Sequence, residues 1–463
     1  MALFYKKESI IVMFLKNLSS GLLIVLLIGN AMAMNNFFKN ISLDNASLSI
    51  NGNLRFRYEY QNNYNIKQYT NTKDNYLLER IRLNIGLKIS QGLKMFVQFQ
   101  DSHCIDCNLT LKDFKGKSPY VNEFEIRQAY LEWRRIKGSS FGFKIGRQQI
   151  SYRDSHVFGP GSWGNVGRYT WDAIMLKYES VYFNLDAFFA KQIFYLPKRF
   201  LDKHYPYNVY ALYTQIKKLP IILDIFYIFK YNHSDTTDEF GNFFPKEERH
   251  TFGFYFKGKK LLYNKDLFLS YSGLFAYQIG SRHNKNRNYA NESISAYGWY
   301  VNLGLNYKFF VPQSFWLKYS YGSGDKNPDD DKTQTFDGIF SGMDKYFGRM
   351  NLFCWNNIKD YQLSYQLKDI IKNLKIIIDY HWFYLDQKND YWYYANGKPV
   401  KDHKPPFSSS YLGREWDVFT IYDFNKHFQF QFGCCHFYPS TAIVKSGFHE
   451  KADYVIFQTF IKF

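Results

Sequence analysis

Hydrophobic and polar residues alternate along much of the chain, which is the pattern of β-strands. In residues 54–60 the apolar and aromatic side chains stand at the even positions, and Arg55, Arg57 and Glu59 stand between them. Successive side chains of a strand point to opposite faces of a sheet. The segment therefore predicts a strand with one apolar and one charged face. The same alternation occurs in residues 81–89, 301–309, 361–368 and 428–432.

Clusters of Asn, Gly, Asp, Lys and Pro separate these segments, and no linker or change of composition divides the chain. Repeated strands of ~10 residues between such clusters are typical of a single all-β domain, above all an antiparallel β-barrel. Some segments do not follow the pattern. Residues 370–371 and 376–378 are continuous apolar runs, and residues 125–133 change phase in their middle, as a β-bulge would cause. Their faces stay unassigned.

Alternation alone does not distinguish a soluble sandwich from a membrane barrel, because either fold buries one face of each strand. Three features favour the barrel. The polar faces carry arginine and glutamine rather than scattered Ser, Thr and Glu, and the N-terminus has the character of an export signal. The last strand, residues 453–463, ends on Phe463, an ending similar to the recognition signal of outer-membrane barrels. We therefore expect the bacterial outer membrane as the location.

The N-terminal residues 1–33 predict a secretory signal peptide. An apolar run at residues 22–28 follows Lys16 and precedes Ala31, Met32 and Ala33, so that a basic region, a short apolar region and a small-x-small cleavage site occur in order. We expect cleavage after Ala33 and a barrel over residues 34–463. The alternative is an uncleaved anchor or a buried helix, although the run is short for a bilayer of ~30 Å.

Composition narrows the class further. A hydrophobic content of 46% and a mean hydropathy of −0.41 exclude a polytopic helical membrane protein, which needs repeated apolar spans of ~20 residues. Aromatic residues make up 21%, which suits the interface belts of a barrel, although a base-composition bias of the gene would also enrich Phe and Tyr. At roughly 24–27 residues per strand and connection, the chain predicts about 16–18 strands and an aqueous channel.

The formal net charge of +18 suits an anionic partner, and export argues against nucleic acid. Cys104 and Cys107 allow a disulfide within a loop, whereas a zinc site would need a second ligand pair that the sequence lacks. Residues 322–331 begin like a calcium loop, but Asp330 takes the glycine position and Phe336 that of the bidentate glutamate. A solvated acidic loop is the simpler interpretation. We expect no metal and no cofactor.

No nucleophile elbow, zinc-protease helix or phosphate-binding loop motif occurs, so no catalytic residues are assigned and we do not expect an enzyme. Arginines instead recur at the polar faces and ends of the strands. A guanidinium is a planar fork that binds carboxylates in pairs of hydrogen bonds, and a ring of such groups in a wet lumen would favour anions. The alternative is a structural network in which Asp and Glu neutralise the arginines.

Several stretches resemble the alginate export porins of the bacterial outer membrane. In the order of that family they are residues 77–83, 126–132, 144–152, 163–173, 321–325, 335–340 and 413–417. Each motif is short, but the ordered set spans about residues 50–450. The resemblance implies a monomeric barrel of 18 strands whose constriction carries arginines interleaved with a few acidic residues. The pore-lining residues it implies are Arg55, Arg57, Arg80, Arg82, Asp101, Arg127, Arg147, Arg168, Asp172, Arg349, Arg414 and Asp417.

The leading hypothesis is a channel for an anionic, uronate-like polysaccharide or oligosaccharide. Its surroundings would be outer-membrane lipid and lipopolysaccharide, with periplasmic partners in export. The chain is unusually rich in lysine for the family and carries the Cys104–Cys107 loop, so its cargo need not be alginate. Two alternatives stay open: an uptake porin for small anions such as sugar acids, and a barrel that binds or cleaves polysaccharide. We further predict that replacing Arg127 and Arg147 lowers anion selectivity.

Overall fold

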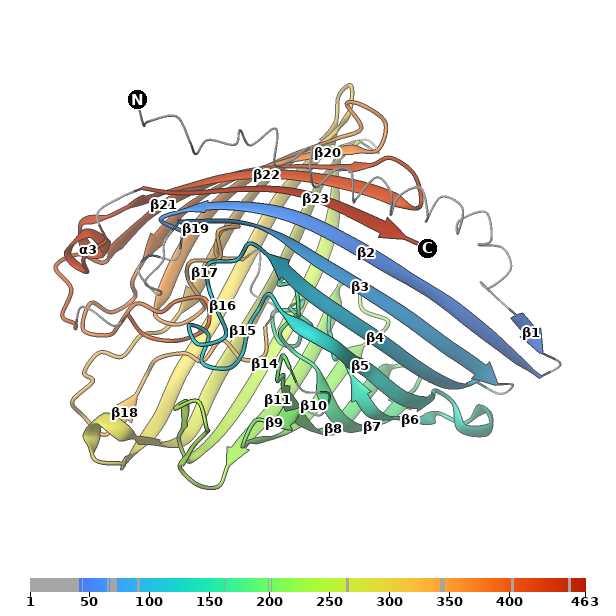
Figure 1. The fold of residues 1–463 in the computed structure, drawn as a ribbon, viewed down its shortest axis with the longest axis horizontal. Coiled ribbons are helices and arrows are strands. Elements are labelled where there is room, and N and C mark those ends of the chain that lie inside the picture. The colour runs from blue at the N-terminus through green and yellow to red at the C-terminus, as the bar shows by residue number, and fades with distance from the viewer. Residues whose placement is uncertain are drawn as a thin grey trace, which may run out of the picture.

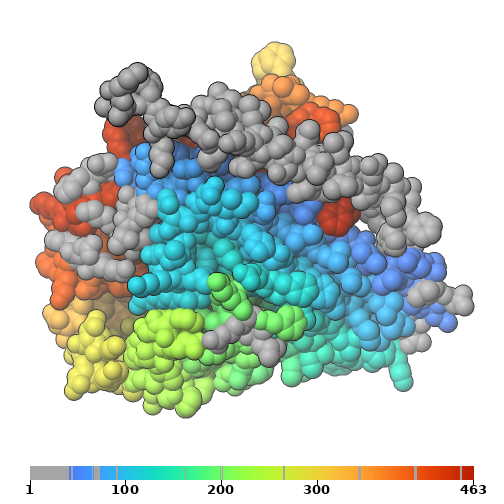
Figure 2. Space-filling view, viewed as in Figure 1, coloured from blue at the N-terminus to red at the C-terminus, as the bar shows by residue number. Residues whose placement is uncertain are grey.

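The computed structural model describes residues 41–463 except 44, 65, 67–72, 90–91, 162, 199, 201, 264–265, 342–345, 401–403 and 449–450. The signal peptide predicted for residues 1–33 lies outside these residues. Eighteen antiparallel strands form a closed barrel, in which the last strand pairs with the first along Asn53–Lys462 to Asn62–Asp453. Figure 1 shows the long tilted strands side by side, and Figure 2 shows the early strands as a continuous wall. The all-β barrel that the sequence predicts is confirmed.

The barrel strands follow one another around the wall in chain order. They are β2 (Ala46–Asn62), β3 (Lys73–Ile89), β4 (Leu93–Ile105), β5 (Asn122–Trp133), β6 (Phe141–Gln148), β7 (Trp171–Glu179), β8 (Phe183–Phe194), β10 (Asn208–Ile216), β11 (Ile222–Asn232), β14 (Glu247–Tyr263), β15 (Leu267–Asn284), β16 (Ala290–Lys308), β17 (Pro312–Gly322), β19 (Ile358–Lys368), β20 (Leu374–Tyr384), β21 (Tyr411–Asp423), β22 (Phe428–Pro439) and β23 (Ala452–Lys462).

Small elements occur outside this wall. They are the strands β1 (Ile41–Leu43), β9 (Lys203–His204), β12 (Thr236–Thr237), β13 (Phe243–Phe244) and β18 (Lys332–Thr333), the helix α3 (Thr441–Lys445), and the 3-10 turns η2 (Ile136–Gly138) and η3 (Lys285–Arg287). Among the described residues, no helix is long and apolar enough to span a membrane. The structure joins Cys104, near the end of β4, to Cys107 in the connection that follows by a disulfide, as the sequence allows.

The two ends of the barrel differ. At one end the connections are short, such as residues 180–182 and 309–311. At the other end they are long, and residues 149–170, 323–357 and 385–410 connect β6 to β7, β17 to β19 and β20 to β21. We call these the short-turn end and the long-loop end, and we number the three loops by their residues.

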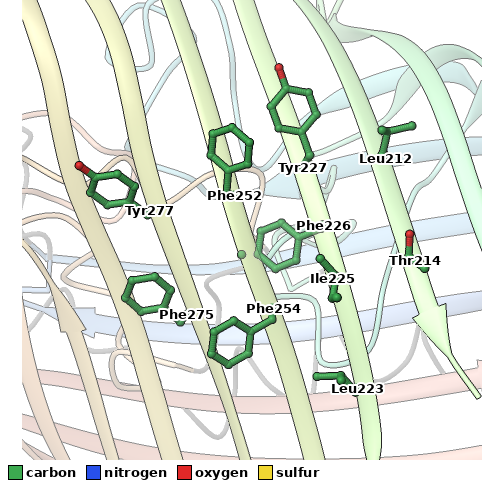
Figure 3. A pocket seen from close by; sticks show the side chains of 11 residues that line it. Leu212, Thr214, Leu223, Ile225, Phe226, Tyr227, Phe252, Phe254, Phe275 and Tyr277 are labelled. Atoms are coloured by element: carbon green, nitrogen blue, oxygen red, sulfur yellow. The ribbon is translucent and has the colours of Figure 1, made fainter.

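The outer wall is apolar because one side chain in two along each strand faces away from the lumen. Leu212, Ile225, Phe254 and Phe275 are all exposed on neighbouring strands. Figure 3 shows them with other aromatic and aliphatic side chains around a shallow apolar hollow of about 570 Å³. A surface of this kind is stable against lipid acyl chains and unstable against water.

The three long loops contribute an apolar core at the long-loop end. Phe158 of loop 149–170, Trp355 of loop 323–357 and Trp392 of loop 385–410 are fully buried in one cluster that also includes inward side chains of the strands, such as Trp171. The two apolar runs that resist the alternation have different causes. Ile370 and Ile371 are exposed in the short turn between β19 and β20. In β20, Ile377 belongs to the buried cluster and Ile378 is exposed on the outer wall, so both faces of this strand are apolar there.

Candidate solute-binding site in the lumen

Five arginines lie on the lumen face of β2, β3 and β5, three of the first four strands of the wall. They are Arg55 and Arg57 of β2, Arg80 and Arg82 of β3, and Arg127 of β5. Arg55 stands opposite Arg80 in the antiparallel register, so the two side chains share one face. Alternation puts Arg82 on the same face as Arg80, while its neighbour Ile81 is 42% exposed on the outer wall. We call these five residues the arginine ladder.

A bulge brings Arg127 into the ladder. The pairing of β4 with β5 matches Gln98 with Gln128 and Phe99 with Ile126, which leaves Arg127 as the extra residue. The phase change that the sequence shows in residues 125–133 is thus confirmed as a bulge. Arg127 is fully buried and its guanidinium lies 4.9 Å from the centre of the Tyr195 ring.

Two carboxylates accompany the ladder. Arg57 Nε lies 2.6 Å from Glu59 Oε1, and Arg127 Nη1 lies 3.6 Å from Glu125 Oε1. Gln100 links Glu125 to Arg82, because its Nε2 donates to Glu125 Oε1 over 2.6 Å and its Oε1 accepts from Arg82 Nε over 2.5 Å. Glu59 and Glu125 cannot neutralise five guanidinium groups, so the ladder keeps excess positive charge in a buried place.

Part of loop 149–170 lies directly on the ladder. Arg55 donates from Nη1 to the Trp163 carbonyl over 3.1 Å, and Arg57 donates from Nη1 to the same oxygen over 2.7 Å. Arg55 Nη2 also reaches the Gly164 carbonyl and Asn165 Oδ1 over 3.1 and 3.0 Å. The Arg57 guanidinium packs over the Trp163 ring at 4.5 Å. Neutral carbonyl oxygens thus occupy donors that would bind a carboxylate more strongly.

Asn165 fixes this segment to the wall. Its buried side chain donates from Nδ2 toward the backbone carbonyls of Glu79, His103 and Tyr120 over 2.8 to 2.9 Å. Gly167 follows with a φ of +90°, and a Cβ there would lie 2.4 Å from Arg127 Nη2. A glycine is therefore required where the loop approaches the ladder.

Several donors of the ladder have no hydrogen-bond partner among the described residues. They are Nη2 of Arg82 and Nε, Nη1 and Nη2 of Arg127. Unmet hydrogen bonds of a buried guanidinium are costly, and an anion that accepts these hydrogen bonds recovers that cost. The arrangement is thus suited to bind carboxylate groups.

An acidic wall faces the lumen on β19, β20 and β21. Asp360, Asp379, Glu415 and Asp417 are buried there around His381, whose Nδ1 lies 3.0 Å from Asp360 Oδ2 and whose Nε2 lies 3.9 Å from Asp417 Oδ2. Loop 323–357 binds this wall. Its backbone donates from Arg349 N to Asp417 Oδ2 over 3.0 Å and from Met350 N to Glu415 Oε1 over 2.9 Å. The lumen therefore has a basic and an acidic side.

The structure brings together most of the predicted residues but not all. Arg55, Arg57, Arg80, Arg82, Arg127 and Asp417 face the lumen from strands. Arg168 and Arg349 come from loops: Arg168 Nη1 donates to the Ala395 carbonyl over 3.1 Å, and Arg349 lies over the Phe419 ring at 4.9 Å.

Four predicted residues lie on the outer face instead, and their assignment to the pore lining is corrected here. Arg147 and Asp172 stand opposite each other in the register of β6 and β7. Arg147 lies two residues after Ile145, and Asp172 lies two residues before Ile174. Both isoleucines are on the outer wall, 41% and 51% exposed, so Arg147 and Asp172 share that face. Asp101 stands opposite the exposed Ile81, and Arg414 is exposed over the Tyr438 ring. They face outward because side chains alternate along a strand, so the residue next to a lumen-facing side chain points to the outer wall.

Sequence reasoning missed several lumen residues. Glu59 lies on the charged face that the alternation of residues 54–60 predicts, but it was not among the predicted pore-lining residues. Glu125 lies in the segment whose phase changes, so alternation did not assign its face. His381 and Asp379 follow the apolar run of β20, whose faces the sequence did not reveal. Asn165 lies in a loop, where no periodicity indicates its role.

Loops 323–357 and 385–410 meet at two buried carboxylates. Asp390 accepts hydrogen bonds from Asp325 N over 3.0 Å, from the Thr335 hydroxyl over 2.6 Å and from the Tyr393 hydroxyl over 2.8 Å. Burial, with a smaller contribution from Asp390 and Asp330, raises the pKa of Asp325 to about 6. The docked loops therefore hold a proton on Asp325 that free loops release near their ordinary pKa.

We expect docking of these loops to weaken as the pH rises from about 4 to about 6, because in this window the free loops have lost the proton that the docked state keeps. Hydrogen–deuterium exchange of residues 325–335, corrected for intrinsic rates, should be slower at pH 4.5 than at pH 7. Asp325→Asn should remove the difference. An equal pH dependence in this variant would contradict the assignment to Asp325.

Elsewhere, His156 holds loop 149–170 against the lumen wall. Its ring packs at 4.1 Å from Tyr300 and 3.6 Å from Tyr346, and its Nδ1 lies 3.0 Å from Asp154 Oδ2. Burial alone would raise the pKa of Asp154, but His156 and Tyr300 lower it to about 2. The Asp154 carboxylate therefore stays ionised over the ordinary pH range.

Within the described residues, no group of three or more His, Cys, Asp or Glu side chains is arranged to hold a metal ion. The carboxylates of the acidic wall bind His381, Arg349 and backbone amides instead.

Comparison with known proteins places these features in context. Residues 46–456 match the sequence profile of the family described as alginate export. No curated protein sequence matches the chain significantly. Acinetobacter baumannii OccAB2 is similar in structure, with a TM-score of 0.60 and 12% identity over 90% of this chain and 98% of that one.

Two Pseudomonas aeruginosa structures share the fold as well. OpdK, solved with vanillate, has a TM-score of 0.57 and 10% identity over 89% of this chain and 98% of that one. The outer membrane protein OprD has a TM-score of 0.56 and 10% identity over 90% and 93%. At such identities the likeness shows the fold of an outer-membrane porin.

Proposed function

Because the chain belongs to the alginate export family and folds as an outer-membrane channel, we propose that it passes an anionic, uronate-like polysaccharide or oligosaccharide along the arginine ladder. In barrels of the bacterial outer membrane the short turns face the periplasm and the long loops face outward. The ladder then lies near the middle of β2 and β3, beneath the part of loop 149–170 that folds into the lumen.

The observation that carries the proposal is the unequal charge of the ladder. Five guanidinium groups meet two carboxylates, Glu59 and Glu125, and the donors of Arg127 have no hydrogen-bond acceptor among the described residues. A polymer with one carboxylate on each sugar would supply the missing acceptors in succession, and each would leave one arginine as it reached the next. A neutral sugar would not offset the buried charge.

Reversal potentials in a salt gradient across a planar bilayer test the proposal. We expect Arg127→Gln to lower the anion-to-cation permeability ratio severalfold, because fixed charge at a narrow place sets the local potential. Arg414→Gln is the matched control: it removes the same charge from an exposed position on the outer face, over the Tyr438 ring, so its ratio should stay within error of the unchanged protein. A cation-selective or unselective parent channel would refute the proposed cargo.

A second candidate is the uptake of small organic anions. It is favoured by the vanillate in the OpdK structure, since vanillate is a small carboxylate and OpdK shares the fold. Current block by a uronate trimer and by vanillate distinguishes the two. Block by the trimer at far lower concentration supports the polymer channel, because several carboxylates then bind several rungs at once.

A further inference from the structure

A second group of cations lines the lumen nearer the short-turn end. In the register of the wall Lys88 stands opposite Lys94, Lys94 opposite Glu132, and Glu132 opposite Lys144. These residues form one row across β3, β4, β5 and β6, which Figure 1 shows side by side. The row faces inward, because Met95 and Ile145, which follow Lys94 and Lys144 along their strands, are exposed on the outer wall.

Tyr130 holds two of these lysines. Lys144 Nζ lies 4.0 Å and Lys94 Nζ lies 5.6 Å from the centre of its ring, and Lys94 also donates to the Tyr130 hydroxyl over 3.3 Å. Lys94 packs over Phe96 at 4.9 Å as well. An aromatic ring attracts an ammonium group through its quadrupole without neutralising the charge. These ring contacts therefore leave both ammonium groups without a negative counter-charge.

The nearby carboxylates are engaged by other cations. Lys177 lies 4.0 Å from Glu132 and 3.7 Å from Asp186, and Arg134 lies 3.7 Å from Glu132. In the part of the chain that the structure describes, no carboxylate lies within ion-pair distance of Lys94 or Lys144. Both side chains are partly exposed, in contrast to the buried ladder.

A neutral belt separates this row from the arginine ladder. Asn84 donates to Asn51 over 2.8 Å, Gln98 donates to Asn84 over 2.7 Å, and Gln128 donates to Gln98 over 3.2 Å. The side chains of the belt use one another as partners, so it offers little to a charged group. Along β3, Arg82 and Lys88 are six residues apart, or about 20 Å at ~3.4 Å per residue.

We propose that Lys94 and Lys144, held by Tyr130, form a second anion-binding station at the short-turn end, which takes a carboxylate group of the same acidic saccharide before or after it meets the arginine ladder. The inference rests on the proposed function and adds a separate site to it. Two ammonium groups on one ring supply donors from two directions to a single carboxylate. Partial exposure lets solvent and solute exchange there, so this station binds weakly and releases quickly.

Block of the channel by trigalacturonate, added in turn to each side of a planar bilayer, tests the station. The variant Lys94→Gln with Lys144→Gln should raise the half-blocking concentration about tenfold for addition from the short-turn side and less than twofold from the long-loop side. Lys94→Arg with Lys144→Arg should retain block, since the charge stays in place. Maltotriose, a neutral trimer, serves as the probe without carboxylates and should block all variants alike.

The matched control is Lys372→Gln with Lys426→Gln, which removes the same charge from exposed short turns at the same end. It should leave the half-blocking concentration unchanged. An unchanged value in the Lys94 and Lys144 variant, or an equal rise in the control, would overturn the station while the anion selectivity of the parent stands. A parent channel that trigalacturonate does not block would overturn the station and the proposed cargo together. Native mobility on unheated gels checks that each variant forms the barrel.

Discussion

Replacing Asn165 by alanine is expected to raise the single-channel conductance severalfold. The Asn165 side chain accepts from Arg55 and donates toward three backbone carbonyls of the wall, and it is fully buried. Its loss leaves buried carbonyls and a guanidinium donor without these hydrogen bonds, at roughly 1–3 kcal/mol for each group. The segment 163–167 should therefore leave the arginine ladder more often and widen the lumen.

A loss of about 3 kcal/mol in docking corresponds to a change of more than a hundredfold in the ratio of docked to released loop. Single-channel recording at fixed voltage measures both the conductance and the fraction of time spent open. Asn286→Ala is the control, because Asn286 is an exposed asparagine of the turn η3, far along the chain from the ladder. If the conductance of Asn165→Ala equals that of the parent, the loop does not limit the lumen at the ladder.

The second large effect is expected for Trp355→Ala, which should destabilise the packed loops by about 3–5 kcal/mol. Trp355 is fully buried, with ring centres 5.2 Å from Phe336 and 5.4 Å from His156, and its indole N–H donates to the Tyr321 carbonyl over 2.8 Å. The alanine variant loses this packing and leaves a cavity between loop 323–357 and β17. The barrel wall itself should stay closed, because its strand pairing does not involve the indole.

Near-ultraviolet circular dichroism on heating separates the two parts of the structure. The aromatic signal of the loops should disappear at a lower temperature in Trp355→Ala, whereas the far-ultraviolet signal of the strands should keep its transition. Phe310→Ala is the matched control, since Phe310 lies in a short turn and is 84% exposed. Its expected effect is within about 0.5 kcal/mol. A joint loss of both signals in Trp355→Ala would show that loops and wall unfold as one unit.

These expectations link the loops to transport. The same segment that closes over the ladder supplies carbonyl oxygens where a solute would supply carboxylates. Under the proposed function, an anionic solute would compete with these carbonyls for the guanidinium donors and would have the stronger interaction, because its hydrogen bonds are charge-assisted. Loop 149–170 would then satisfy the buried guanidinium groups when no solute is present, and the lysine station would concentrate anions at the other end of the lumen.

The arginine ladder shows which side-chain directions the alternation of polar and apolar residues can predict. Arg55, Arg57, Arg80 and Arg82 lie on regular strands, where the side-chain period of two assigns faces without knowledge of the rest of the chain. Arg127 also faces the lumen, although it lies at a bulge that the sequence indicates only as a change of phase. Beyond this bulge Ala129 faces outward. Arg147 of β6 stands opposite Ala129 and therefore also faces the outer wall.

The sequence by itself determined the closed antiparallel barrel, the apolar outer wall and the charged lumen face of β2 and β3, because these follow from a local period of two. Only the tertiary structure decided the phase beyond the bulge, the docking of Trp163 and Asn165 on the ladder, and the acidic wall around His381. Each of these depends on contacts between residues far apart in the chain. No local pattern encodes such contacts, since the same loop composition is compatible with many positions over the lumen.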